Sequence, residues 1–389
     1  MKTLTRASYN NIFVKTAMKH LFSLLMCLAI SPAFAQQPAL SIDATSYLLA
    51  DFHTGQVLAS HNAYDRIEPA SLTKLMTAYV VFTAVKQKHI SLDQNIPVSE
   101  RAWRMIGSRM FIEPNKKVTV DELIRGMIVQ SGNDACIALA EAVAGSEEIF
   151  AQMMNKEAER LNMRSTHFVN ATGLPNPNHY STAHDLALLA TAIIRDFPEF
   201  YPLYSIKEFA YNDITQPNRN RLLWLDPHVD GMKTGWTKTA GFCLVTSAIR
   251  DKRRLISVVM GTESANARSM ESQRLLNYGF QFYDTLHLYK KDEVLTTIQL
   301  WKGAENALKA GFNRDVYFTL QKGQADQLKA TMEYKQPLIA PVRIGQEVGT
   351  VRFTLNGRTI ETYPLVALEK IGTANVFGRA WDGVKLLFN

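Results

Sequence analysis

The feature that most constrains the fold of this chain is an apolar segment at residues 72–82. Apolar side chains recur there at the i, i+3, i+4, i+7 spacing of a helix, and further apolar residues cover most of the remaining helix surface. Pro69 precedes the segment and suits the start of a helix. A helix that is apolar on nearly every side must be surrounded by other elements, so the sequence predicts a buried central helix.

Ser71 and Lys74 are the polar exceptions at the start of this helix. Side chains three residues apart lie on the same side of a helix. Burial would lower the pKa of Lys74 toward the neutral amine, which can accept a proton from the Ser71 hydroxyl. The helix N-terminus would also favour negative charge that develops near Ser71. The pair is a candidate nucleophile and base, and a serine cap beside a lysine that reaches solvent is the structural alternative.

The first 35 residues have the pattern of a secretory signal peptide. Basic residues precede the apolar run LFSLLMCLAI, and Ala33-Phe34-Ala35 fits a cleavage site. The apolar run is too short to cross a bilayer as a stable helix. We therefore expect an exported mature chain of residues 36–389. Cleavage leaves 39 Lys and Arg against 36 Asp and Glu, a formal charge of +3 without basic runs, so we expect no nucleic-acid partner.

The mature chain is long enough for two domains. Runs of alternating polarity predict β-hairpins at residues 45–60 and 241–261, so the outer strands of one sheet come from distant parts of the chain. Helical periodicity occupies residues 120–130, 133–145, 147–162 and 183–196 between them. From residue 284 to 371 short strands and turns follow, including the hairpin signal Asn356-Gly357, which predicts a small all-β domain.

The last residues of the chain predict an amphipathic helix. Apolar side chains recur at helical spacing in residues 374–389, and Arg379, Asp382 and Lys385 lie elsewhere on the helical wheel. Such a helix, with Trp381 and Phe377 on one face, is typical of insertion in the plane of a membrane surface. The alternative is a terminal helix packed on the β domain.

Cysteine and histidine residues give little indication of a disulfide or a metal site. Cys136 and Cys243 both have apolar neighbours, which favours two buried free thiols over a disulfide. His179, His184 and Asp185 are the nearest approach to a ligand cluster, and a loop and helix-start role explains them better than a metal site.

Two further motifs change the interpretation of Ser71 and Lys74. Ser131 and Asn133, in an S-x-N motif, lie between two predicted helices and offer a hydroxyl beside an amide. Lys233, Thr234 and Gly235 precede a strong strand, where Lys and Thr can bind a carboxylate and Gly lets a substrate backbone approach. The ordered set S-x-x-K, S-x-N and K-T-G is typical of β-lactamases and penicillin-binding proteins.

The sequence thus resembles the serine penicillin-recognising family, and within it the D-alanyl-D-alanine carboxypeptidases, which are low-molecular-mass penicillin-binding proteins of Gram-negative type. Segments 107–141, 167–190 and 218–248 carry this likeness beyond the three motifs. The resemblance implies an α/β (α+β) transpeptidase-like domain at residues 36–283, with an antiparallel sheet flanked by helices and a helical cluster. It also implies an all-β domain at residues 284–371 and a membrane-anchoring amphipathic helix at residues 372–389.

The resemblance also implies the role of each motif residue. Ser71 would be the acylated nucleophile and Lys74 its general base, and Ser131 and Asn133 would relay protons and contact the substrate amide. The implied substrate-binding residues are Lys233, Thr234, Gly235 and Arg268, of which Lys233, Thr234 and Arg268 would bind the substrate carboxylate. Backbone N–H groups of Ser71 and of Trp236 or Thr237 would form the oxyanion hole.

The function that follows is a D,D-carboxypeptidase that removes the terminal D-Ala from peptidoglycan pentapeptides through an acyl-enzyme. Penicillin and other β-lactams would acylate the same serine, and no metal or organic cofactor would be needed. The enzyme would lie at the periplasmic face of the inner membrane, attached peripherally through its last helix.

Three alternatives remain open at the level of sequence. A β-lactamase would need a group that positions water, and no Glu-x-x-Leu-Asn element lies between Ser131 and Lys233. The motifs do not exclude D,D-endopeptidase activity on cross-links. A non-catalytic module that binds peptidoglycan or β-lactams would also retain these motifs.

Overall fold

The catalytic part of the chain is built on a five-stranded antiparallel sheet. The structure is a computed structural model that describes residues 40–387, so the predicted signal peptide lies outside the described residues. The strand order is β2-β1-β9-β8-β7. The strands are β1 (Ser46–Asp51), β2 (Val57–His61), β7 (Val229–Thr237), β8 (Gly241–Arg250) and β9 (Arg253–Thr262). Both predicted hairpins are confirmed, and β1 pairs with β9 across about two hundred residues of sequence.

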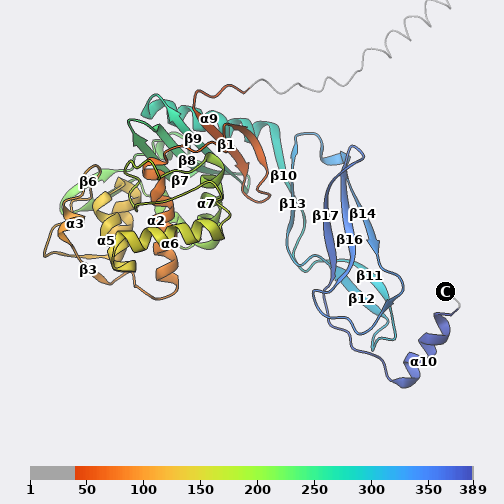
Figure 1. Cartoon of the computed structure of the whole chain (residues 1–389). Coiled ribbons are helices and arrows are strands. Elements are labelled where there is room, and N and C mark those ends of the chain that lie inside the picture. Colours follow the sequence, from red (N-terminus) through yellow and green to blue (C-terminus); the bar gives the residue numbers. More distant parts are fainter. Residues whose placement is uncertain (1–39, 388–389) are drawn as a thin grey trace, which may run out of the picture. The chain divides into compact units, whose positions relative to one another are not determined.

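Helices cover both faces of this sheet. Helix α9 (Ala265–Phe282) packs on one face and α7 (Ala183–Asp196) on the other (Figure 1). Successive residues of a strand point to opposite faces, and the sequence follows this rule. Leu48 belongs to the core cluster on the α7 side, whereas Leu49 lies against Gly279 of α9.

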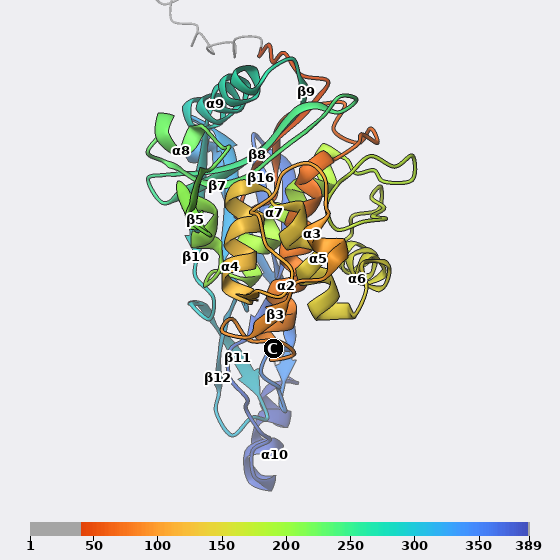
Figure 2. The same ribbon diagram turned by 90° about the vertical axis from the view of Figure 1, so that its left-hand side faces the viewer.

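Helix α2 (Lys74–Lys86) is the buried central helix that the sequence predicts. It follows a 3-10 turn, Ala70–Thr73, and helices α5 and α6 pack against it (Figures 1 and 2). Ten of its 13 residues are buried, including Lys74. The surrounding helices are α3 (Glu100–Trp103), α4 (Val120–Arg125), α5 (Asn133–Ala144) and α6 (Glu147–Arg160).

The predicted helix at residues 120–130 changes from an α-helix to a π-helical turn along its length. Helix α4 ends at Arg125, and a π-helical turn, Gly126–Gln130, continues to Ser131. An added Cβ at Gly126 would lie 2.3 Å from the Met110 sulfur, so only glycine leaves room for this contact. The remaining short elements are β3 (Asn95–Pro97), β4 (Lys117–Thr119), β5 (Glu208–Tyr211), β6 (Ile214–Pro217), α8 (Leu222–Leu225) and the 3-10 turn Tyr201–Ser205.

The rest of the chain confirms the predicted all-β domain. A six-stranded sheet has the order β14-β16-β17-β12-β11-β15, and a second sheet pairs β10 with β13. The Asn356-Gly357 turn joins β16 to β17 as predicted. The strands are β10 (Tyr283–Tyr289), β11 (Val294–Trp301), β12 (Ala307–Gly311), β13 (Val316–Gln321), β14 (Leu328–Tyr334), β15 (Leu338–Ile339), β16 (Glu347–Leu355) and β17 (Arg358–Ala367), with a 3-10 turn at Ala325–Gln327.

Asp51 connects the first strand to the start of the β domain. Its carboxylate accepts the backbone N–H groups of His53 and Thr54 at 2.9 and 3.1 Å. The same buried carboxylate contacts the Arg253 guanidinium at 3.5 Å and accepts the Thr285 hydroxyl. A buried carboxylate is stable only when it is paired and hydrogen-bonded. The loss of any of these partners would therefore destabilise the folded state at this point of the chain.

The predicted C-terminal helix is present as α10 (Val376–Lys385). The apolar side chains Phe377 and Trp381 are 87% and 63% exposed, so the helix does not bury them on the β domain. Asp382 instead accepts the backbone N–H of Lys302 at 2.7 Å. Among residues 40–387, no helix is both long enough and apolar enough to cross a membrane.

Candidate active site

The three predicted motifs meet in one cleft. Ser71 lies in the 3-10 turn before α2. Ser131 directly follows the π-helical turn, and Asn133 is the first residue of α5. Residues 233–235 lie on the edge strand β7. The cleft has a volume of about 610 Å³. Ser71, Ser131, Asn133, Thr234, Gly235 and Arg268 line it, while Lys74 and Lys233 are almost completely buried behind its wall.

The side-chain nitrogen of Lys74 contacts three different segments of the chain. Lys74 Nζ lies 3.0 Å from Ser71 Oγ, 2.8 Å from Asn133 Oδ1 and 2.6 Å from the Thr172 carbonyl oxygen. Burial lowers the pKa of Lys74 from its ordinary value, which favours the neutral amine.

These contacts orient the neutral amine as a base. The Asn133 and Thr172 oxygens can only accept hydrogen bonds, so they take the two N–H groups of a neutral amine. The third direction, toward Ser71 Oγ, is then left for the nitrogen lone pair. The geometry therefore fits removal of the Ser71 proton by Lys74.

Ser131 and Asn133 are held in different ways. Asn133 is fixed because its amide nitrogen donates to the Ile106 carbonyl at 2.7 Å while its oxygen accepts from Lys74. Ser131 has a left-handed backbone with φ of 69°, and its buried hydroxyl has no hydrogen-bond partner among the described residues. An unpartnered buried hydroxyl is costly in the absence of a ligand, so Ser131 is available to one that enters the cleft.

Asp134 positions the wall beside these residues. Its buried carboxylate accepts the backbone N–H groups of Met110 at 3.0 Å and Phe111 at 2.8 Å. The backbone N–H of Asn133 also donates to the Ser108 carbonyl at 2.7 Å. Ser108 lines the cleft, so these bonds fix one of its walls.

The opposite wall is strongly cationic. Burial lowers the pKa of Lys233 well below its ordinary value, with the nearby positive charges of Lys74 and Arg219 acting in the same direction. Burial also lowers the pKa of Arg268 to about 10. A carboxylate that enters the cleft would relieve this repulsion, so the wall is suited to an anionic group.

Arg219 is a cleft residue that the sequence did not single out. It lines the cleft, and its charge acts on both Lys74 and Lys233. The buried side chains of Asn218 and Asn220 hold its backbone, because they bond the Ile206 and Gly231 carbonyls at 2.9 and 3.1 Å. The only indication of Arg219 in the sequence is its place between two asparagines, whose side chains can hold the backbone of a loop.

The cysteines and histidines have structural surroundings. Cys136 and Cys243 are both free and buried, as predicted, and burial raises the pKa of Cys136 to about 12. His179 is buried, with its ring nitrogens contacting Thr73 Oγ1 at 2.8 Å and the Val169 N–H at 3.1 Å. Burial lowers the pKa of His179 to about 4, so the ring is neutral.

A serine beside a buried lysine, next to a cationic wall, defines the class of enzymes that transfer acyl groups through serine. Residues 32–264 match the D-alanyl-D-alanine carboxypeptidase family, peptidase S11, and residues 283–373 match the penicillin-binding protein 5 C-terminal domain. The chain therefore belongs to the D-alanyl-D-alanine carboxypeptidase family of serine hydrolases, and the resemblance found in the sequence is confirmed.

Similar proteins cover nearly the whole chain. D-alanyl-D-alanine carboxypeptidase DacC of Escherichia coli K12 is 44% identical over 90% of this chain and 89% of its own length. DacA of the same strain is 41% identical over 98% of this chain and 99% of its own length. The crystal structure of penicillin-binding protein 5 from Haemophilus influenzae has a TM-score of 0.82 and 40% identity, covering 86% of this chain and 99% of that one.

Gly173 offers a test of how the Thr172 carbonyl is held. Gly173 has φ of +81°, and an added Cβ would lie 1.8 Å from the Ala70 carbonyl oxygen. We expect Gly173→Ala to lower stability and to slow acylation of Ser71, because Thr172 must shift away from Lys74. The matched control is Gly145→Ala, where φ is +78° and the space is open. That control should lower the free energy of unfolding only by the backbone strain, about 1–2 kcal/mol. Urea unfolding and the rate of penicillin labelling measure the two effects, and equal results for both variants would contradict this account.

The pH dependence of acylation tests the role of Lys74. Only the neutral amine accepts a proton, so the rate should rise with pH as Lys74 loses its proton. Because burial lowers its pKa, the midpoint of this rise should lie below the value of free lysine, about 10.4. Stopped-flow acylation by penicillin across the neutral and alkaline range gives the midpoint. A rise centred at or above the value of free lysine would show that Lys74 is not a desolvated base.

Proposed function

We propose that this enzyme removes the terminal D-Ala from peptidoglycan pentapeptides through an acyl-enzyme on Ser71. The observation that carries the proposal is the contact between Lys74 Nζ and Ser71 Oγ at 3.0 Å, in a site where burial favours the neutral amine. No histidine lies among the residues that line this cleft, so within the described chain the base is a lysine.

The first step is acylation. Ser71 Oγ attacks the carbonyl carbon of the D-Ala-D-Ala bond while its proton passes to Lys74 Nζ. Backbone N–H groups of Ser71 and of Trp236 or Thr237 stabilise the oxyanion, because β7 is an edge strand that pairs on one side only. The peptide bond then breaks, and the proton on Lys74 passes to the leaving nitrogen through Ser131, whose hydroxyl has no partner among the described residues, so Lys74 is neutral again.

The cationic wall selects the substrate. The terminal carboxylate of the peptide binds at Lys233, Thr234 and Arg268, with Arg219 adding positive charge. Asn133 contacts the substrate amide. The carboxylate of a β-lactam takes the same place, so its strained amide is presented to Ser71.

The second step is hydrolysis. Water attacks the acyl carbonyl and gives a proton to Lys74 Nζ. The bond between the acyl carbon and Ser71 Oγ then breaks, Lys74 returns the proton to Ser71 Oγ, and the shortened peptide leaves as a carboxylic acid. Covalent catalysis of this kind divides one difficult reaction into two easier ones.

We further propose that the protein is exported and held at the periplasmic face of the inner membrane by α10. The exposed apolar face of this helix supports the proposal, since a helix with Trp381 and Phe377 uncovered gains free energy by entering the membrane interface. The signal-peptide pattern at residues 1–35 supports export.

Ser71→Ala tests the reaction. We expect the variant to lose both penicillin labelling and D-alanine release from a peptide ending in Lys-D-Ala-D-Ala, because the nucleophile is gone. A chromogenic assay for D-alanine on the purified full-length protein gives the result, with thermal unfolding to verify that the variant is folded. Retained D-alanine release in a folded variant would refute the mechanism. Penicillin labelling of the unaltered enzyme without D-alanine release would favour the endopeptidase or binding-module alternative.

Removal of the last helix tests the membrane proposal. A chain that ends at Thr373 should remain in solution when the full-length protein sediments with anionic lipid vesicles. Trp381→Ser alone should weaken vesicle binding about tenfold, since burial of a large apolar side chain contributes about 1.5–3 kcal/mol. Equal sedimentation of the shortened and full-length chains would exclude α10 as the anchor.

A further inference from the structure

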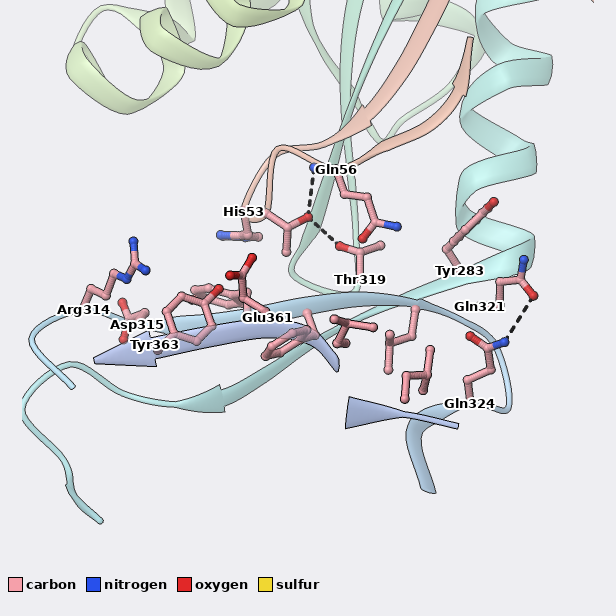
Figure 3. A pocket seen from close by; sticks show the side chains of 16 residues that line it. His53, Gln56, Tyr283, Arg314, Asp315, Thr319, Gln321, Gln324, Glu361 and Tyr363 are labelled. Carbon is pink, nitrogen blue, oxygen red and sulfur yellow. Dashed lines mark hydrogen bonds between the residues drawn. The ribbon is translucent and has the colours of Figure 1, made fainter. Parts of the chain in front are cut away.

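A second cleft lies apart from the catalytic motifs, between the β1–β2 turn and strands β13 and β17 (Figure 3). Its volume is about 760 Å³, against about 610 Å³ for the catalytic cleft. His53 and Gln56 line one side, and Tyr317, Glu361 and Tyr363 line the other. None of these residues belongs to the three catalytic motifs.

The two sides of this cleft are joined by direct contacts. The ring of Tyr317 is stacked between His53 and His287, with ring centroids 4.5 and 4.3 Å apart. The hydroxyls of Thr54 and Thr319 are hydrogen-bonded at 2.8 Å. Both faces of the Tyr317 ring are therefore occupied by histidine rings.

One end of the cleft carries two opposite charges that do not pair with each other. The Arg314 guanidinium lies over the ring of Tyr363, 4.6 Å from its centroid. Burial and the nearby Glu361 carboxylate raise the pKa of Tyr363, while Arg314 opposes the shift, so both charges lie near one side chain. Yet neither Arg314 nor Glu361 forms an ion pair within the described residues. Figure 3 shows both side chains directed toward the His53 side of the cleft.

The other charged groups at this end already have partners. Asp315 accepts His287 Nε2 at 3.2 Å and the Lys291 N–H at 2.9 Å. Glu361 Oε1 accepts the backbone N–H of Thr362 at 3.1 Å, but neither Glu361 nor Arg314 has an ion-pair partner among the described residues, so these are the two charges left for a ligand. A ligand that carries a carboxylate and an ammonium close together satisfies both at once, because guanidinium binds carboxylate in a planar, bidentate way.

The opposite end of the cleft is lined by amides. Gln321 and Gln324 lie there, hydrogen-bonded to each other at 3.4 Å, and Gln56 lies nearer the middle of the cleft, beside Thr319 (Figure 3). The Gln56 side chain is exposed, and an amide can both donate and accept hydrogen bonds. Amides suit the peptide groups of a ligand that extends from the charged end.

We propose that this cleft binds an α-amino-acid group with a free ammonium and a free carboxylate, held by Glu361 and Arg314 respectively. Two sources share this chemistry. One is a free amino acid, such as the D-alanine that the carboxypeptidase reaction releases. The other is the free end of a diamino acid within a peptide, whose remaining length would follow the amides.

Ligand-observed NMR on the full-length protein in detergent tests the proposal. The enzyme is first acylated with penicillin, so that the catalytic cleft is occupied. The probes are D-alanine and meso-2,6-diaminopimelate. The control compounds are pimelate, which carries only carboxylates, and 1,5-diaminopentane, which carries only ammonium groups. Arg314→Gln and Glu361→Gln are compared with Arg352→Gln, an exposed arginine of β16 outside the cleft. Equal penicillin labelling verifies that each variant is folded.

We expect the amino-acid probes to bind and the single-charge probes to bind at least about tenfold more weakly. Each cleft variant should lose at least about tenfold in affinity, and Arg352→Gln should lose none. D-alanine binding as tightly as meso-2,6-diaminopimelate would identify the free amino acid as the source, and tighter binding of meso-2,6-diaminopimelate would identify the diamino acid. Absent binding, equal binding of the single-charge probes or unchanged binding in both cleft variants would overturn the proposal.

Discussion

The structure of the catalytic site depends on the burial of one amine. Lys74 lies on the central helix, where an ammonium would be unfavourable because its charge is removed from water. Its nitrogen is stabilised there by oxygens from two other parts of the chain, Asn133 Oδ1 and the Thr172 carbonyl. Three segments therefore meet at the Lys74 nitrogen: helix α2, the S-x-N segment and the loop around residue 172. Ser71 Oγ is the remaining contact of this nitrogen.

The charge distribution around this amine is consistent with the proposal that the site binds a carboxylate beside a neutral Lys74. Lys233, Arg219 and Arg268 form a wall whose positive charges are poorly solvated. Burial is the main cause of the lowered pKa of Lys74, and the charge of Arg219 in this wall acts in the same direction. The Asp134 carboxylate acts in the opposite direction on the pKa of Lys74, and its hydrogen bonds to the backbone of the facing wall stabilise the shape of the cleft.

The β domain is connected to the catalytic domain by specific polar contacts around Asp51, in addition to the chain itself. These contacts place the β1–β2 turn against β13, and the cleft with Arg314 and Glu361 is a consequence of that junction. The same junction thus has a structural role and provides the surface on which a second ligand site is proposed.

The sequence by itself determined the elements that depend on local periodicity and on short motifs. The central helix, both hairpins, the Asn356-Gly357 turn and the buried cysteines follow from patterns within a few residues, and the three motifs identify the reaction class. Only the tertiary structure decided which groups complete the site. The Thr172 carbonyl is a backbone atom without a signature of its own, and Arg219 acts on Lys74 only because distant segments converge. Arg314 and Glu361 likewise are ordinary surface charges in the sequence, and the fold alone places both beside Tyr363 without letting them pair.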